Sequence, residues 1–385
     1  MAASDSAQYR AQALRARDGL VTWLRDAAYP FWSTRGMCRE HGGFQEAVDL
    51  QGNPLDVPRR GRVQPRQIFS FAKAPRFGWS GDASEAVSHG LAYFLKHYRR
   101  PDGLFRTLVA KHGAPLDHTA VLYDQAFALL AFAAAAEVLG PGSGMAAEAD
   151  RLRAAICQHM RRPGGGFYSL MTPGPPLQSN PHMHLLESSL AWARVTGSAA
   201  FQEIADEIGE LALRHFIDPA SGVLRESFDD RWAPAEGLSG QIVEPGHQFE
   251  WAFLLLSWKG AEREDVRRAA LRLIDHAERH GVRKGVAINA LLDDFSVHDG
   301  AARLWPQTER LRAATIAARL IGGARYWQMV NEAAAGLVRY FDAPVPGIWQ
   351  DLLLPSGEFR PVPVPAGNLY HIVGAIEELC TCFPH

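Results

Sequence analysis

The feature that most constrains the fold is a regular alternation between two kinds of helical segment. The first kind carries an apolar stripe at helical spacing and charged residues opposite, as in 264–280, where Leu273 and Ile274 belong to the stripe. This pattern predicts a helix with one buried side and one exposed side. The second kind, such as 119–139, is apolar almost all round, as expected of a helix enclosed by others.

The alternation predicts twelve helices in six pairs. The half-exposed segments are 10–31, 84–99, 146–161, 200–216, 264–280 and 325–341, and the enclosed segments are 66–78, 119–139, 182–196, 246–258, 306–321 and 367–382. Proline, which fits the first turn of a helix, lies near the start of five enclosed segments. These prolines are Pro65, Pro181, Pro245, Pro306 and Pro365. Closing six such hairpins into a ring gives an all-α (α/α)6 barrel, so we expect residues 1–385 to form one domain.

Short glycine-containing elements follow most of the half-exposed segments and are predicted to form small β-hairpin arms, with glycine supplying the tight turn. These elements are 42–49, 102–109, 164–171, 221–228 and 347–354.

Charge and cysteine content exclude several classes of protein. A formal net charge of −2 over 385 residues predicts no nucleic-acid or anionic-membrane partner. The sequence shows neither an 18-residue apolar run nor an apolar leader near its start, so we expect no membrane span or secretory signal. The four cysteines are irregularly spaced, which favours free thiols in a reducing cytoplasm over a zinc site. They are Cys38, Cys157, Cys380 and Cys382.

Polar residues crowd the first turns of the enclosed segments, where a barrel interior should be apolar. Because all six segments run in one direction, these turns converge at one end, as in a site for a small ligand. The groups are Arg66 and Gln67; Tyr123, Asp124 and Gln125; His182, His184 and Glu187; Glu244, His247 and Glu250; Trp305, Gln307 and Glu309; and Asn368, Tyr370 and His371. Leaving them all buried without partners would cost about 1–3 kcal/mol each.

Histidine is the natural general base in such a site, and the dipole at a helix start favours its neutral form. His247 and Glu250 share one helix face because they are three residues apart. His182 and His184 are splayed by about 200° on a helix, so they are poorly placed to share an ion even with Glu187 or Glu250 added. We therefore expect neither a metal nor a cofactor.

Five strings resemble the N-acylglucosamine 2-epimerase superfamily, which includes mannose isomerase, sulfoquinovose isomerase and cellobiose 2-epimerase. They are RQIFSFA, NPHMHLLES, EPGHQFEW, RLWPQTE and LYHIVGAIEEL, spread in order over residues 62–379. The resemblance implies an (α/α)6 barrel and metal-free proton transfer by two histidines, His247 and His371. It also implies that Arg66 stabilises an enediolate and that His184 assists ring opening or substrate contact. Glu250 and Glu309 match supporting acids, and Tyr123, Glu187, Trp305, Gln307 and Glu309 are the predicted substrate-binding residues.

The sequence favours isomerisation of a free hexose, above all mannose to fructose, in a monomer or homodimer. RLWPQTE has one tryptophan where cellobiose 2-epimerases tend to have a pair, which disfavours a disaccharide. No broad cluster of Lys and Arg indicates a phosphate or sulfonate, although Arg59, Arg60 and Arg62 could bind one. The alternatives are a sugar 2-epimerase, a sugar-binding protein without activity, and a glycoside hydrolase, which would need two carboxylates flanking a glycosidic bond. The hydrolase candidates are Asp124, Glu187, Glu250 and Glu309.

Overall fold

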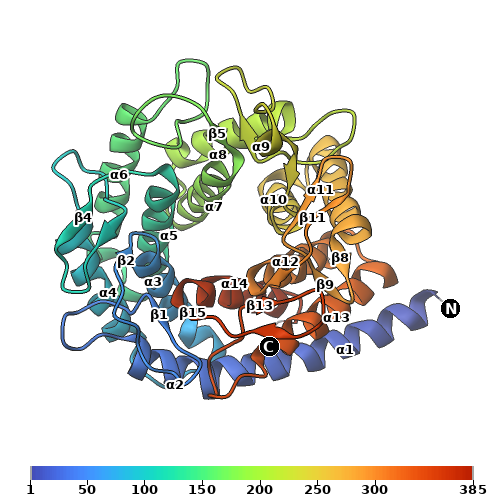
Figure 1. The fold of residues 1–385 in the computed structure, drawn as a ribbon, viewed down its shortest axis with the longest axis horizontal. Coiled ribbons are helices and arrows are strands. Elements are labelled where there is room, and N and C mark those ends of the chain that lie inside the picture. Colours follow the sequence, from blue (N-terminus) through green and yellow to red (C-terminus); the bar gives the residue numbers. More distant parts are fainter. Residues whose placement is uncertain (1, 384–385) are drawn as a thin grey trace.

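The structure is a computed structural model that describes residues 2–383, and its helices form two concentric rings (Figure 1). The inner ring consists of α3 (Val63–Lys73), α5 (Leu122–Leu139), α7 (Ser179–Thr196), α10 (Pro245–Lys259), α12 (Leu304–Leu320) and α14 (Leu369–Thr381). Each inner helix packs against the next, and α14 packs against α3, which closes the ring. The predicted (α/α)6 barrel is confirmed.

The outer ring consists of α1 (Ala2–Trp23), α4 (Ala83–Tyr98), α6 (Met145–His159), α8 (Ala199–Leu211), α11 (Glu264–His276) and α13 (Ala324–Val338). Three outer helices continue into π-helical turns. Helix α8 continues into Ala212–Phe216 and α11 into Ala277–Gly281. Helix α1 continues into Leu24–Ala28, then into α2 (Tyr29–Phe31), and then into a second π-helical turn, Trp32–Gly36. The predicted segment 10–31 is too short at both ends. Helix α1 reaches further because it packs along α13, where the Asn331 amide donates a hydrogen bond to the Tyr9 carbonyl.

Helix α5 is long and apolar enough to pass a composition test for a membrane span, with a mean hydropathy of 1.4 over 18 residues. The expectation that no stretch of this kind exists was therefore too strict. In the barrel α5 is an inner helix that packs against α3, α6 and α7, and 72% of this stretch is buried. Its apolar surface belongs to the core of the protein.

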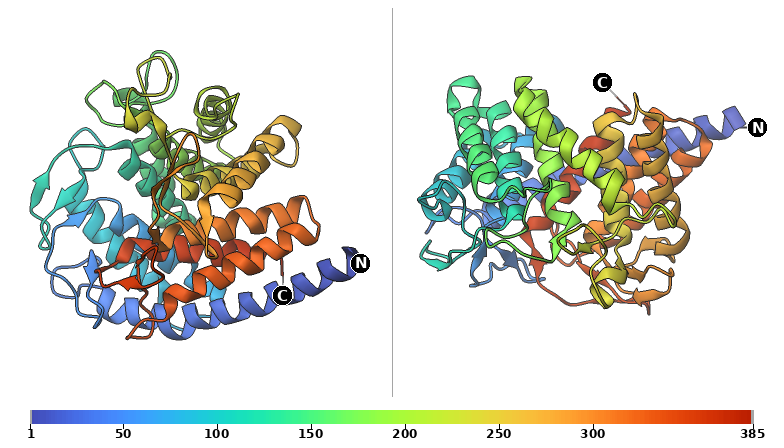
Figure 2. Two further views of the ribbon diagram at one scale, coloured as in Figure 1. Left: turned by 45° about the vertical axis from the view of Figure 1, so that its right-hand side comes forward. Right: turned by 90° about the horizontal axis from the view of Figure 1, so that it is seen from above.

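The arms lie on one side of the barrel (Figure 2), where strand pairs join most neighbouring hairpins. The strand that enters one inner helix pairs with the arm of the following hairpin. The pairs are β2 (Arg59–Arg60) with β3 (Leu108–Val109), β5 (Leu177–Gln178) with β6 (Ser227–Phe228), β7 (Ile242–Val243) with β10 (Ala290–Leu292), β12 (Ala302–Arg303) with β13 (Leu352–Leu353), and β15 (Val364–Pro365) with β1 (Ala47–Val48). Local hairpins add β4 (Pro115–Asp117), β11 (Val297–Asp299), β14 (Phe359–Arg360) and the pair β8 (Val282–Arg283) and β9 (Val286–Ala287).

Two features of the arms differ from the sequence prediction. Segment 164–171 contains no strand and makes single bridges only, between Val121 and Leu170 and between Arg161 and Phe167. The hairpins within 282–299 were not predicted, because their apolar residues do not alternate for long. A short four-residue helix, α9 (Leu238–Gln241), also lies in the arm before α10.

Glutamines at the start of the inner helices attach the arms to the barrel. In each case the side-chain oxygen accepts from a backbone N–H of the arm, and the amide nitrogen donates to the carbonyl of the same residue. The four pairs are Gln64 with Phe44, Gln125 with Phe105, Gln248 with Leu224, and Gln307 with Ala287. These buried bonds fix each arm against the first turn of its own helix.

Candidate active site

A cavity of about 550 Å³ opens at the end of the barrel where the inner helices begin. This volume is within the range of small-molecule sites, roughly 300–1,000 Å³. All six inner helices contribute to its wall, as the sequence predicts. The wall residues include Arg66 of α3, Tyr123 of α5, Asn180 and His184 of α7, His247 and Glu250 of α10, Trp305 of α12, and Asn368 and His371 at the start of α14.

Arg66 is a nearly buried cation for which no carboxylate partner exists among residues 5–383. Its guanidinium Nη2 donates to the Tyr123 hydroxyl at 2.5 Å, and its Nε has no hydrogen-bond partner. Its Cζ lies 4.2 Å from the centre of the Phe127 ring and 5.3 Å from that of Tyr370. An unpaired guanidinium at the wall of a cavity is suited to stabilise an anion that forms there.

His247 and His371 lie on either side of Trp305. The centre of the tryptophan ring is 5.0 Å from that of His247 and 5.7 Å from that of His371. Gly246 makes room for this ring, since a Cβ at position 246 would come within 2.4 Å of it. The two histidines belong to α10 and α14, which are separated by α12, so they reach one cavity from different sides.

His371 is held as a neutral base. Its Nδ1 lies 2.7 Å from Glu309 Oε1, so Nδ1 carries the proton and the lone pair of the ring is on Nε2. Burial, followed by the positive charge of Arg66, lowers the pKa of His371 well below its usual value. This matches the neutral ring expected from the sequence.

His247 has the opposite charge state, which corrects the expectation of a neutral ring. Its Nδ1 lies 2.9 Å from Glu226 Oε2 and 3.9 Å from Glu244 Oε2. Burial lowers the pKa of His247, but the two carboxylates outweigh burial and raise the pKa to about 10. Their charges also outweigh the helix dipole, so His247 is a cation at neutral pH and can act as an acid.

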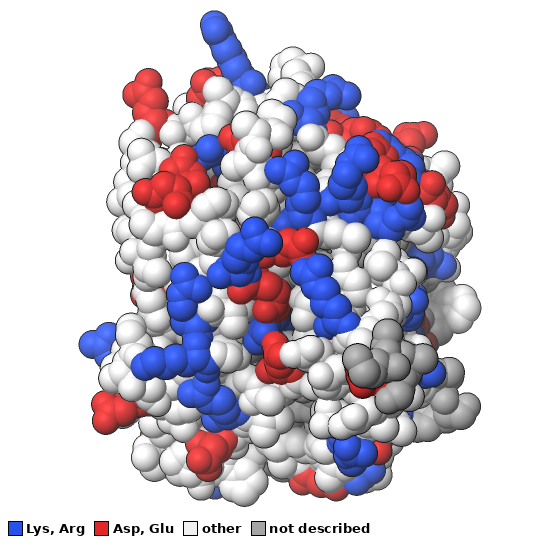
Figure 3. Space-filling view, turned by 90° about the vertical axis from the view of Figure 1, so that its right-hand side faces the viewer, with Lys and Arg blue, Asp and Glu red and all other residues white. Residues whose placement is uncertain are grey.

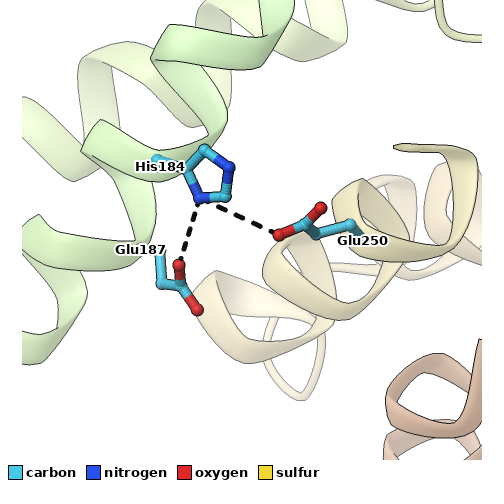
Figure 4. A group of neighbouring side chains, drawn as sticks. All are labelled: His184, Glu187 and Glu250. Atoms are coloured by element: carbon cyan, nitrogen blue, oxygen red, sulfur yellow. Dashed lines mark hydrogen bonds and ion pairs between the residues drawn. The ribbon is translucent and has the colours of Figure 1, made fainter. Parts of the chain in front are cut away.

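Figure 4 shows His184 with two glutamates around its Nδ1. Glu187 Oε2 lies 3.3 Å from this nitrogen and Glu250 Oε1 lies 3.8 Å from it. Burial lowers the pKa of His184 to about 4, so this ring is neutral as well. Burial also raises the pKa of Glu250 well above its usual value, and the charges of Glu309 and Glu187 add to the effect. Glu250 therefore accepts a proton more readily than an ordinary glutamate, and it lines the cavity wall.

Three predicted substrate-binding residues do not line the cavity. Gln307 is fixed to the Ala287 backbone, so its amide is unavailable to a substrate. Glu309 is fully buried and contacts His371, and Glu187, which is 7% exposed, contacts His184. We assign the two glutamates to orienting the histidines. Tyr123 and Trp305 do line the cavity.

His182 is another structural residue of the first turns. Its Nε2 accepts from the Phe167 N–H at 3.0 Å and its Nδ1 lies 2.7 Å from the Gln178 carbonyl oxygen. In accepting from the arm N–H, His182 takes the place that glutamine has in four other hairpins. Burial lowers the pKa of His182 to about 4, which keeps the ring neutral.

The side chains that could bind a metal belong to this same cluster. His184, Glu187 and Glu250 form one group of close ligand atoms, and Glu250, Glu309 and His371 form another. The Arg312 guanidinium already lies between them, donating to Glu187 Oε1 at 2.9 Å and to Glu309 Oε2 at 3.0 Å. The positive charge that an ion would bring is thus supplied by the chain, and the residues fit a metal poorly.

Three arginines line the rim of the cavity, and one of them differs from the three that the sequence suggested. Arg60, Arg62 and Arg303 are all present, whereas Arg59 is buried and donates to the Gly42 carbonyl. Each rim arginine faces a carboxylate: Arg60 pairs with Glu46, Arg62 with Asp124 at 3.4 Å, and Arg303 with Glu244 at 3.5 Å.

Sequence reasoning missed Glu226, Arg312 and Asn180. Glu226 lies in the 221–228 arm, and the fixed contact between that arm and the start of α10 brings it to His247.

Outside the cavity, the four cysteines are free, as predicted. Figure 3 shows the face over α11 and α13, where positive and negative side chains intermingle.

Known proteins resemble this chain in sequence and in fold. It is 47% identical over 374 residues to a mannose-6-phosphate isomerase of Rhizobium meliloti (strain 1021), covering 94% of this chain and 96% of that protein. It is 27% identical over 378 residues to a D-mannose isomerase of Thermobifida fusca, covering 88% and 90% of the two chains.

Two solved structures superpose on nearly the whole barrel. A D-mannose isomerase gives a TM-score of 0.85 at 21% identity over 96% of this chain and 97% of that one. The cellobiose 2-epimerase of Bacillus thermoamylovorans also gives 0.85, at 17% identity over 94% and 98%. The model of the N-acylglucosamine 2-epimerase (GlcNAc 2-epimerase) family matches residues 42–375, and the chain belongs to this family of sugar isomerases and epimerases.

Proposed function

We propose that the protein is an aldose–ketose isomerase that converts D-mannose to D-fructose through a cis-enediolate, without a metal or another cofactor. The observation that carries this proposal is a neutral histidine and a cationic histidine around one cavity, next to an unpaired arginine. Relatives named for mannose isomerisation support the choice of sugar.

The first half-reaction uses neutral His371 as the base and cationic His247 as the acid. His371 Nε2 removes the C2 proton of the open-chain aldose, and the C–H electrons form the C1=C2 double bond. The carbonyl π electrons move onto O1, where Arg66 stabilises the negative charge and the His247 cation supplies a proton. Glu309 orients His371 throughout, since its carboxylate accepts the hydrogen bond from the Nδ1–H of that ring.

The second half-reaction gives the ketose. His247, neutral after giving its proton to O1, takes the O2 proton, and the O2 electrons form the C2=O bond. The C1=C2 electrons then take up the proton that protonated His371 returns to C1. Return of the proton to C2 from the opposite face would give glucose instead, which is the 2-epimerase alternative. Ring opening is assigned to His184, whose neutral imidazole reaches the same cavity.

Proton NMR of mannose, glucose, fructose and N-acetylmannosamine in D2O with the protein tests the proposal. We expect fructose from mannose, with deuterium entering C1 of the product. Glucose or N-acetylglucosamine as the main product would replace the isomerase with an epimerase. A protein that binds mannose without converting it would contradict both.

A second candidate substrate, mannose 6-phosphate, is favoured by the three rim arginines and by the name of the 47% identical relative. Each rim arginine already has a carboxylate partner, which weakens the attraction for a phosphate. The same NMR assay with mannose 6-phosphate decides between the two sugars. If the phosphate is recognised, kcat/KM is higher for the phosphorylated sugar, and Arg303→Gln and Arg60→Gln lower only that value.

The glycoside hydrolase alternative loses support. Of its four candidate carboxylates, only Glu250 lines this cavity. Asp124 and Glu309 are buried, and Glu187 lines a separate cavity.

A further inference from the structure

We propose that Arg312 is a positioning residue that holds two histidine–carboxylate pairs, His184–Glu187 and His371–Glu309, in a fixed orientation relative to each other. The inference rests on the proposed function, because it assigns those histidines to one proton-transfer site. Arg312 itself does not line the active-site cavity, so its effect passes through the carboxylates.

The guanidinium of Arg312 forms hydrogen bonds with two carboxylates, one from each of its terminal nitrogens. Arg312 Nη2 donates to Glu187 Oε1 at 2.9 Å and Nη1 donates to Glu309 Oε2 at 3.0 Å. The second oxygen of each carboxylate faces a histidine Nδ1, at 3.3 Å for His184 and 2.7 Å for His371. The Tyr370 hydroxyl also donates to Glu187 Oε2.

Arg312 is itself held firmly. Its Cζ lies 4.0 Å from the centre of the Phe253 ring of α10. Gly374 of α14 also lies next to it, since a Cβ at position 374 would be in ordinary van der Waals contact, 3.6 Å from the same Cζ. Helices α7, α10, α12 and α14 therefore meet around a single guanidinium.

A planar guanidinium is needed for this task. Its two terminal nitrogens reach carboxylates from two different helices at once, whereas the ammonium of lysine is a single point charge on a flexible four-carbon stem. Without the fork, each carboxylate keeps its histidine contact but loses the bond that sets its own direction. The Nε2 atoms of the two rings then lose their fixed orientation toward one substrate.

A second cavity gives experimental access to this residue. It has a volume of about 390 Å³, lies at the opposite end of the barrel among the C-terminal halves of the inner helices, and includes Arg312 in its wall. A guanidinium ion added to the solution can therefore replace the side chain removed by Arg312→Ala.

The experiment compares Arg312→Ala with Arg310→Ala, with and without guanidinium, at concentrations far below those that unfold proteins. Arg310 is a matched control because it is equally buried on the same helix and forms a two-bond pair with Glu278, remote from the histidines. We expect Arg312→Ala to lower kcat by about 10²-fold, on the scale of a lost orienting contact, with little change in KM. Guanidinium should restore part of kcat, and methylammonium should not.

Several outcomes would overturn the proposal. One is a kcat of Arg312→Ala within threefold of that of Arg310→Ala, and another is equal rescue by methylammonium. If Arg312→Ala does not fold, Arg312→Lys is measured instead, and a kcat close to that of the wild type has the same meaning.

A measurement without substrate separates this proposal from the proposed function. The ¹⁵N chemical shifts of the histidines report which ring nitrogen carries the proton. In the wild type His371 and His184 should each show a single Nδ1–H form, and Arg312→Lys should mix the two forms. An unchanged spectrum would contradict positioning by Arg312 even if no sugar were converted. A changed spectrum with no conversion of sugar by the wild type would contradict only the isomerase assignment.

Discussion

The two histidines beside Trp305 differ in charge because different groups surround them. Two carboxylates, Glu226 and Glu244, face His247, and they raise the pKa of that ring against the effect of burial. Burial and the cation of Arg66 act in the same direction on His371 and lower its pKa. One cavity thereby contains a proton donor and a proton acceptor at the same pH, as proton transfer between neighbouring carbons requires.

We expect Glu226→Gln to move the alkaline limb of the pH profile to lower pH. If His247 acts as an acid, activity needs its proton and is lost as the pH rises through its pKa of about 10. Removing the nearest carboxylate lowers that pKa, so the loss begins earlier. The measurement is kcat/KM for mannose against pH, with Glu236→Gln, an exposed carboxylate elsewhere in the arm, as the control. An alkaline limb that stays in place would show that His247 does not act as the acid.

Arg66→Lys keeps a positive charge but loses the planar fork that can donate to two oxygens. We expect kcat to fall by about 10²-fold or more, on the scale of one lost oxyanion donor. Steady-state kinetics with mannose measure the effect. Arg62→Lys, at the rim with a carboxylate partner, is the matched control and should change kcat little. A kcat of Arg66→Lys within threefold of the wild type would remove Arg66 from the stabilisation of the enediolate.

At the scale of elements, each inner helix is joined at its start to an arm, and this join determines which polar residues face the substrate. Gln307 and His182 were both candidates for chemistry from their position in the sequence. The structure instead gives them the arm backbone as a partner. A glutamine in the first turn of an inner helix can thus stabilise the fold without touching a ligand.

Gln307→Leu should destabilise the protein and leave substrate binding unchanged. It removes hydrogen bonds to the Ala287 N–H and carbonyl, which are buried and would have no other partner, at a cost of about 2–6 kcal/mol for the pair. Chemical denaturation measures the loss, and KM for mannose should stay within threefold of the wild type. Gln328→Leu, an exposed glutamine on α13, is the control. A raised KM at full stability would return Gln307 to the substrate site.

The sequence predicts the elements well and their contacts only in part. Helical periodicity places both rings and brings Arg66, His184, His247 and His371 to one cavity. Periodicity could not predict the contact of Glu226 with His247 or the position of Arg312 behind the site. Both depend on distances between segments far apart in the chain, and periodicity along one helix carries no information about such distances. The neutral charge state predicted for His247 was wrong for the same reason.

At the scale of the whole molecule, the interior of the barrel balances its own charges. Glu187 and Glu309 are buried with Arg312 between them, and burial raises the pKa of Glu250 well above its usual value, which favours its uncharged form. Burying an unpaired charge is costly, so buried carboxylates need positive charges next to them. Here the chain supplies them on the inner helices, and the ring closes around them.

This balance leads to the last prediction, which concerns metals. Each group of close ligand atoms, His184–Glu187–Glu250 and Glu250–Glu309–His371, would have to release a bond or a proton before it could bind a divalent ion. The positive charge of Arg312, which bonds to Glu187 and Glu309, would also repel the ion. We therefore expect prolonged treatment with EDTA to leave kcat unchanged, and the purified protein to contain far less than one equivalent of zinc, manganese or cobalt. The measurements are metal analysis of the protein and mannose turnover before and after EDTA, with each ion then added back. If activity disappears with EDTA and one divalent ion restores it, the metal-free mechanism is wrong, and Arg312 would have to move away from Glu187 or Glu309 to make room for the ion.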